Sequence, residues 1–165
     1  MDGHELETVE EMTLLGLTLR NDLSWSSNTE EMICKAYKRM WMIKRIKALG
    51  GSIDSLKDIY CKQIRSVLEF GVPVWNCSIT KEQACDIERV QKSFLHIILD
   101  KEYNDYQHAL DMVGLETLEE RRMKLCHNFA KKAAKDPKHK NWFVEYKQVG
   151  VETRSIKYKY VTPLH

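Results

Sequence analysis

Apolar residues recur at steps of three and four positions along most of the chain, the spacing of helices that bury one face. The segments with this pattern are bounded by residues that end helices, such as Gly50-Gly51, Gly71 and Gly114. The pattern predicts helices over residues 27–49, 52–71, 81–99, 105–113 and 117–135. We therefore expect a mainly α fold, a helical bundle of about four to five helices.

The first predicted helix has a defined start and a defined apolar face. Ser27, Asn28 or Thr29 has a side chain suited to the N-cap. Glu30 and Glu31 would then lie in the first turn, where the helix dipole favours acidic residues. The apolar face consists of Ile33, Ala36, Met40, Ile43 and Ile46.

The later helices also carry start signals. Ser52 or Asp54 is expected to open the second helix. Thr80 and Gln83 have the types and spacing of a capping box, so the third helix should begin directly after Thr80. The connection before it is apolar and contains Trp75, and we expect it to pack under the helices.

A β element is expected before the first helix. Residues 12–19 (MTLLGLTL) have the apolar and β-branched content of a strand. Gly16 inside this segment indicates a bulge or a close backbone approach, and Asn21-Asp22 supplies a turn. The fold prediction therefore includes a short N-terminal β-strand or hairpin.

These elements divide the 165 residues into three regions. Residues 1–26 form an acidic leader with the strand, residues 27–136 form the helical bundle, and residues 137–165 form a basic tail. The tail has weak periodicity, and we expect it to be extended or loosely attached.

Charge is strongly segregated along the chain, although the formal net charge is only +2. Residues 1–31 hold eight acids and one base, and residues 32–70 hold nine bases and three acids. The last block, residues 131–165, again holds nine bases and three acids. Such separated basic blocks indicate a polyanionic partner better than the total charge does.

The segment KAYKRMWMIKRIK in the first predicted helix is the sharpest local feature. It places six bases within thirteen residues, and no acid lies between Met32 and Ile53. The cations could follow phosphates, and Tyr37 and Trp41 could stack on bases or sugars. The competing interpretation is a solvated helix face with its aromatic residues in the core. A membrane-surface or calmodulin-target helix is disfavoured because core-forming helices frame this one.

The sequence gives little support for a metal site, a catalytic motif or a membrane segment. The five cysteines form no CxxC pair, and Cys126-His127 with the distant His139 lacks the second close pair of a zinc site. There is no P-loop, GxGxxG, GxSxG or HExxH motif and no run of 18 apolar residues, and the acidic start excludes a signal peptide. We expect no cofactor, no metal, no membrane association and no enzymatic activity. The expected location is the nucleus or the cytoplasm.

The order of several segments resembles the region after the polymerase palm in non-LTR retrotransposon (LINE-type) reverse transcriptases. LLGLTLRNDLSW followed by ICKAYKRM is similar to the family's LG and LxW signatures and the helix after them. LKDIYCKQIRSVLEFGVPVW and IERVQKSFLHII are similar to the next two blocks, and the ending resembles the family's TRSKxKY region. The similarity covers residues 10–160, nearly the whole chain.

The chain departs from the family pattern at a few positions. Leu14 replaces an aromatic residue, Asn28 and Thr29 stand where a histidine is common, and His96 replaces an arginine. The family's paired-aspartate motif, which binds the two catalytic metals, is absent from the sequence. The resemblance therefore does not carry polymerase activity onto this chain.

The resemblance implies a palm-edge strand in residues 1–26 and a thumb-like bundle in residues 27–136, the part that holds primer and template. A thumb contacts the backbone and reads the A-form shape of RNA or an RNA–DNA duplex. Arg65 and the tail's Arg154, Lys157 and Lys159 are weaker candidates for phosphate contacts than the bases of the first helix. The expected nucleic-acid-binding residues are Lys35, Lys38, Arg39, Lys44, Arg45, Lys47 and Arg65.

A second hypothesis belongs to another class. A truncated copy of such a transposable element could be inert, or could serve its host as a helical protein–protein interaction module. Its partner would be another protein, or a second copy of the chain, on the surface left by the missing palm. The acidic residues at the N-terminus would repel nucleic acid and favour this alternative.

Overall fold

The computed structural model describes residues 8–139, 144–145 and 160–161. The described residues form a mainly helical fold that starts with a short antiparallel hairpin, which confirms the predicted fold class. One compact unit reaches to Met123, and a second begins at Lys124, inside α7. The helices are α1 (Ser26–Ala48), α2 (Ile53–Ile59), α3 (Ser66–Leu68), α4 (Val72–Trp75), α5 (Lys81–Leu99), α6 (Tyr106–Val113) and α7 (Leu118–Lys135). Four shorter elements accompany them: a π-helical segment η1 (Tyr60–Arg65), a 3-10 turn η2 (Asp100–Glu102), β3 (Val144–Glu145) and β4 (Tyr160–Val161).

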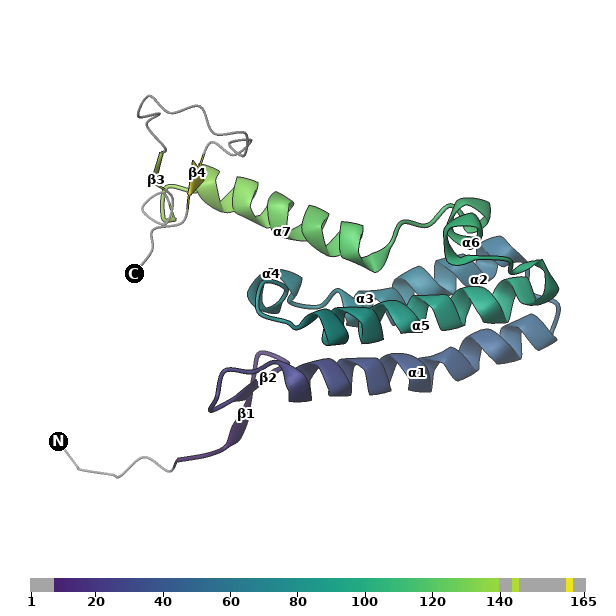
Figure 1. Cartoon of the computed structure of the whole chain (residues 1–165), viewed down its shortest axis with the longest axis horizontal. Helices are drawn as coiled ribbons and strands as arrows, with labels where there is room; N and C mark the ends of the chain where they lie inside the picture. The colour runs from purple at the N-terminus through teal and green to yellow at the C-terminus, as the bar shows by residue number, and fades with distance from the viewer. Residues whose placement is uncertain (1–7, 140–143, 146–159, 162–165) are drawn as a thin grey trace. The chain divides into compact units, whose positions relative to one another are not determined.

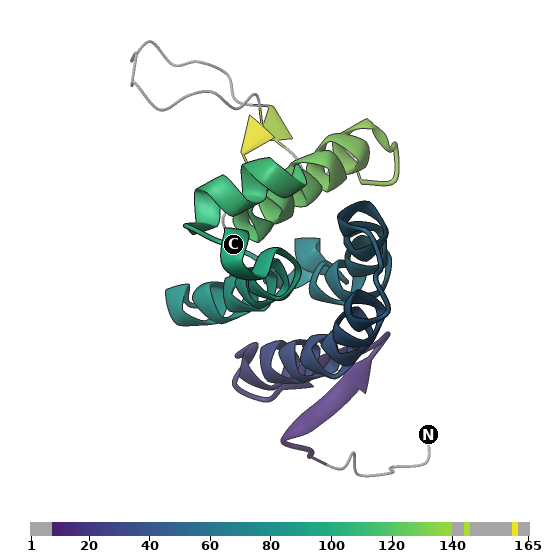
Figure 2. The same cartoon turned by 90° about the vertical axis from the view of Figure 1, so that its right-hand side faces the viewer.

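The segment expected as a short strand or hairpin is a hairpin of β1 (Glu11–Leu14) and β2 (Leu17–Arg20). Leu15 and Gly16 form the two-residue turn, and both have positive φ, 51° and 84°. Two positive φ values are typical of the turns that join tightly twisted strands. Leu15 is an unusual residue for such a turn, since a side chain there is strained. The hairpin lies beside the N-terminal end of α1 (Figure 1, Figure 2).

The predicted cap of the first helix was wrong. The helix begins at Ser26 with Trp25 at the N-cap, and no side chain caps it. The amide of Asn28 is 6% exposed, and its Oδ1 accepts the backbone N–H of Thr18 at 3.2 Å. The Thr18 hydroxyl donates to Glu31 Oε1 at 3.1 Å. The polar residues at the start of α1 therefore hold β2 to the helix, and no acid lies in the first turn.

The second predicted helix starts as expected but is not a regular α-helix. The Ser52 side chain accepts the backbone N–H of Ser55 at 3.3 Å, and this caps α2. The helical stretch then continues through η1 into α3 and ends at Leu68, three residues before the predicted end. Gly71, with a φ of 64°, is the N-cap of α4. The hydrophobic periodicity did not predict these π-helical turns.

The core lies between α1 and α5, which run side by side, and the helical stretch from α2 to α3 (Figure 1). The capping box of α5 is present, as predicted from Thr80 and Gln83. The apolar connection also packs inward as expected, because Val72 and Trp75 in α4 are fully buried. The largest fully buried apolar side chains are Trp75, Tyr60, Phe94, Ile43, Leu56, Ile64, Leu68, Ile87, Leu95, Leu110 and Leu118.

The last predicted boundaries agree closely with the structure. Gly114 ends α6 with a φ of 66°, and α7 stops at Lys135, just before the Asp136-Pro137 pair. The prediction for the tail, residues 137–165, falls almost entirely outside the described residues.

Candidate nucleic-acid interface

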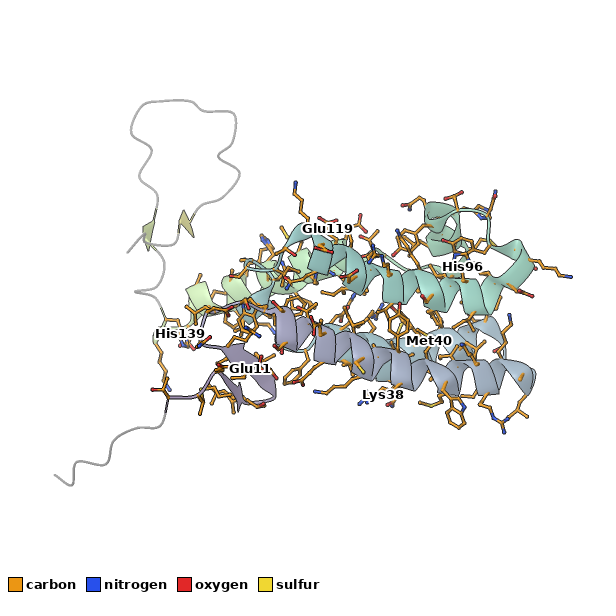
Figure 3. All side chains as sticks on the ribbon, turned by 60° about the horizontal axis from the view of Figure 1, so that its bottom comes forward. Glu11, Lys38, Met40, His96, Glu119 and His139 are labelled. Atoms are coloured by element: carbon orange, nitrogen blue, oxygen red, sulfur yellow. The ribbon has the colours of Figure 1, made fainter. Side chains whose placement is uncertain are left out.

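Helix α1 separates a buried apolar face from a basic solvent face. Met40 is 3% exposed and points toward the neighbouring helices, whereas Lys38 points away from them (Figure 3). Lys44 and Arg45 are also exposed, one to two turns further along the helix. The solvent face of α1, defined here as Lys38, Trp41, Lys44 and Arg45, therefore presents three cations with no acid between Met32 and Ile53.

The aromatic residues of this helix are not in the core. The Trp41 side chain is 67% exposed and Tyr37 is 42% exposed. The Arg45 guanidinium carbon lies 6.0 Å from the centre of the Trp41 ring, at the outer range of a cation–π contact. The Tyr37 hydroxyl lies 3.4 Å from Ser93 Oγ of α5. The interpretation of α1 as a solvated face with buried aromatics was thus wrong about the aromatics.

Three other predicted bases contact protein groups. Lys35 forms an exposed ion pair with Glu31, with Nζ and Oε2 3.0 Å apart. Arg39 donates from Nη1 to the carbonyl of Gln63 at 2.5 Å, and Lys47 donates from Nζ to the carbonyl of Ile97 at 2.5 Å. An exposed ion pair is worth little, so Lys35 can exchange Glu31 for a phosphate at small cost. Lys47 is half-buried, and we give it a smaller part in the interface.

Arg65 lies in a different environment from the other predicted bases. Its side chain is 18% exposed, and its Nε lies 3.5 Å from Glu69 Oε1. The same carboxylate accepts two hydrogen bonds from Arg121, at 2.5 and 3.0 Å. The hydrogen bond to Glu69 raises the pKa of Arg121 above its ordinary value. The structure thus places Arg65 in a half-buried ion cluster that ties α3 to the first turn of α7. The tail candidates Arg154, Lys157 and Lys159 lie outside the described residues.

Several positions that carry the family resemblance hold the fold together. Gln91 is fully buried, and its Oε1 accepts the Tyr60 hydroxyl at 2.8 Å. Its Nε2 donates to the Tyr106 hydroxyl at 3.0 Å and to the Glu116 carbonyl at 2.8 Å. The Tyr106 hydroxyl donates in turn to Glu88, and burial raises the pKa of both tyrosines. This network joins α5 to η1, to α6 and to the segment before α7.

A cavity of about 340 Å³ lies between the hairpin, α1 and α3. Glu31 and Lys35 give it a polar wall, while Leu17, Met32 and Phe70 give it an apolar one. The pKa of Glu31 is lowered by hydrogen bonds from Lys35 and then from Thr18. Sequence reasoning did not find this cavity, because its walls come from three elements that are distant in sequence. Its mixed lining and its ion pair do not assemble a nucleophile or an oxyanion donor.

The described part of the chain contains no group of three or more His, Cys, Asp or Glu side chains placed to hold a metal ion. None of the described helices is both long enough and apolar enough to cross a bilayer.

Comparison with known proteins gives no relative. No protein-family model, no curated protein and no solved structure matches the chain. The resemblance to LINE-type reverse transcriptases therefore rests on the sequence segments alone.

Proposed function

We propose that this chain binds nucleic acid through the solvent face of α1, as a thumb-like region of the kind found in non-LTR retrotransposon reverse transcriptases. The observation that carries the proposal is a helix face with three exposed cations, an exposed tryptophan and no intervening acid. The sequence resemblance supports the same conclusion independently, because its thumb segment includes the same helix.

Binding would be electrostatic and would depend little on sequence. Lys38, Lys44 and Arg45 would each neutralise a phosphate and release counterions. Arg39 and Lys35 lie beside them on α1 and add to the positive potential. The ligand would be recognised mainly by charge and shape, as phosphate contacts carry no sequence information. RNA or an RNA–DNA duplex is the proposed partner, in the nucleus or the cytoplasm.

In this proposal the chain holds a substrate and does not act on it. The paired-aspartate motif of the family is missing from the sequence. Two-metal nucleotide addition requires carboxylates that bind both ions. The proposed activity is therefore binding alone, without polymerisation by these 165 residues.

Charge reversal tests the proposal. We expect the triple variant Lys38→Glu, Lys44→Glu, Arg45→Glu to bind an RNA–DNA duplex at least about ten-fold more weakly than the wild type, because three phosphate contacts become repulsive. Fluorescence anisotropy with a labelled duplex at constant salt measures the change.

The matched control changes net charge equally at other exposed positions. The variant Lys62→Glu, Lys81→Glu, Lys101→Glu alters bases outside α1. It should retain affinity within about three-fold, since overall charge acts only through long-range steering. An equal loss in both variants would contradict a specific role for α1.

The hairpin supports a second candidate function, binding to a protein or to a second copy of the chain. Met12, Leu14 and Leu15 are 50%, 51% and 88% exposed, and Phe70 beside the turn is 53% exposed. Contiguous exposed apolar side chains mark interaction surfaces.

If the hairpin is an association surface, size-exclusion chromatography should show an apparent mass that rises with protein concentration. The variant Leu14→Ser, Leu15→Ser should elute as a monomer at every concentration, because it removes much of the exposed apolar area. A wild-type chain that remains monomeric would remove self-association from this candidate function.

A further inference from the structure

The most exposed aromatic ring of the described α1 residues lies at the centre of its basic face. Trp41 is 67% exposed, although an indole ring normally contributes a large apolar area to the core. Lys38 lies three residues before it and Arg45 four residues after it, so helix geometry places all three on one face. The ring is therefore presented to solvent between two cations.

The surroundings of Trp41 restrict what the ring can bind. A cationic ligand is disfavoured, because Lys38, Lys44 and Arg45 all lie close to the ring along the helix. A ligand with both negative charge and a flat aromatic face fits this surface. Nucleotides combine the two, and base–aromatic stacking needs no particular sequence.

The spacing of the residues on this face also favours a single-stranded ligand over a double-stranded one. Lys38 and Arg45 are seven residues apart, which is about 10 Å along the helix axis. About three stacked nucleotides of one strand cover that length. In a duplex the faces of the internal bases are covered by their neighbours, so only an unpaired base or a terminal pair can meet the ring.

We infer that Trp41 is a stacking residue for an unpaired base of single-stranded nucleic acid, with Lys38 and Arg45 on the flanking phosphates. This inference rests on the proposed function and narrows its ligand: the solvent face of α1 prefers a single strand, or the single-stranded end of a duplex. The attraction between the cations and the phosphates contributes affinity for single strands and duplexes alike. Stacking on Trp41 adds affinity for the single strand.

The test measures the affinity of the full chain for a single-stranded RNA of about 12 nucleotides and for a blunt duplex of the same length. Trp41→Leu keeps an apolar side chain but removes the ring. It should weaken single-strand binding about ten-fold and duplex binding less than about two-fold. Trp41→Phe keeps a ring and should stay within about three-fold of the wild type.

Two controls separate stacking from a general loss of an exposed ring and from unfolding. Phe129→Leu removes another half-exposed ring, on α7, and should leave both affinities unchanged. Trp41 is mostly solvent-exposed, so the thermal midpoint of Trp41→Leu should match that of the wild type.

The outcomes distinguish this inference from the proposed function. If charge reversal weakens binding but Trp41→Leu does not, the proposed function stands and stacking is wrong. If the wild type binds neither RNA, both the proposed function and the stacking inference are wrong. An equal loss of affinity of Trp41→Leu for both RNAs would also overturn the stacking role. So would a Trp41→Leu variant that no longer self-associates but keeps its affinity for the single strand.

Discussion

Gln91→Leu should lower the free energy of unfolding by about 3 kcal/mol, because each buried polar group left without a partner costs about 1–3 kcal/mol. Gln91 is fully buried and makes hydrogen bonds to Tyr60, Tyr106 and the Glu116 carbonyl. Leucine fills a similar volume but leaves the buried hydroxyl of Tyr60 without its acceptor and removes the hydrogen bonds to Tyr106 and to the Glu116 carbonyl. Urea denaturation followed by circular dichroism measures the change.

A double-mutant cycle sharpens this test. Tyr60→Phe removes the hydroxyl that Gln91 accepts, so the pair Tyr60→Phe, Gln91→Leu should cost less than the sum of the single changes. Additive losses would show that the two side chains do not interact. A loss below about 1 kcal/mol for Gln91→Leu alone would show that water replaces its hydrogen bonds.

Trp75→Ala is expected to cost about 4 kcal/mol of unfolding free energy, the upper range for removing a fully buried aromatic side chain. Trp75 is 0% exposed, and its Nε1–H donates to the Phe70 carbonyl at 2.8 Å. Removing the indole leaves a cavity under α4 and orphans that carbonyl. The same denaturation experiment applies, with the slope of the transition checked for a change in cooperativity.

The matched control for Trp75 keeps a ring. Trp75→Phe retains most of the apolar volume and loses only the hydrogen bond, so it should cost about 1–2 kcal/mol. If the alanine variant were as stable as the phenylalanine variant, the indole would not be a core residue.

Both residues belong to segments that carry the family resemblance, and this bears on what the resemblance means. Gln91 and Trp75 are buried, as are Leu56, Tyr60 and Ile64. These positions maintain the helical packing and its polar network, and they touch no outside surface. The shared pattern therefore supports a similar arrangement of helices more directly than it supports a shared ligand.

Much of the helical framework follows from local sequence. The end of α6 at Gly114, the capping box at Thr80 and the buried face of α5 all depend on residues within a few positions of one another. Such short-range signals are strong because the same side chains both form the helix and bury its face.

The features that sequence analysis missed depend on contacts between distant segments. Asn28 was expected to cap α1, but it bonds to Thr18 of the hairpin instead. Leu15 occupies a turn position that favours glycine or asparagine, so the hairpin had no recognisable turn signal. Arg65 was grouped with the surface cations, yet Glu69 and the packing of α3 hold it at 18% exposure. No local pattern reveals these outcomes.

The solvent face of α1 was also predicted only in part from the sequence. The basic composition of α1 was evident from sequence, and its helical phase predicted that Met40 would be buried and Lys38 exposed. The sequence left two interpretations of Trp41 open, stacking on bases or burial in the core, and its 67% exposure excludes burial. This exposure turns a basic helix face into a candidate site for nucleic acid.

The most direct test of the nucleic-acid-binding proposal is the salt dependence of affinity for an RNA–DNA duplex. For three phosphate contacts, the logarithm of the association constant should fall with the logarithm of salt concentration with a slope of about −2 to −3. The variant Lys38→Glu, Lys44→Glu, Arg45→Glu should bind weakly with a clearly flatter slope. An unchanged slope in that variant, or no binding by the wild type at low salt, would contradict the proposal.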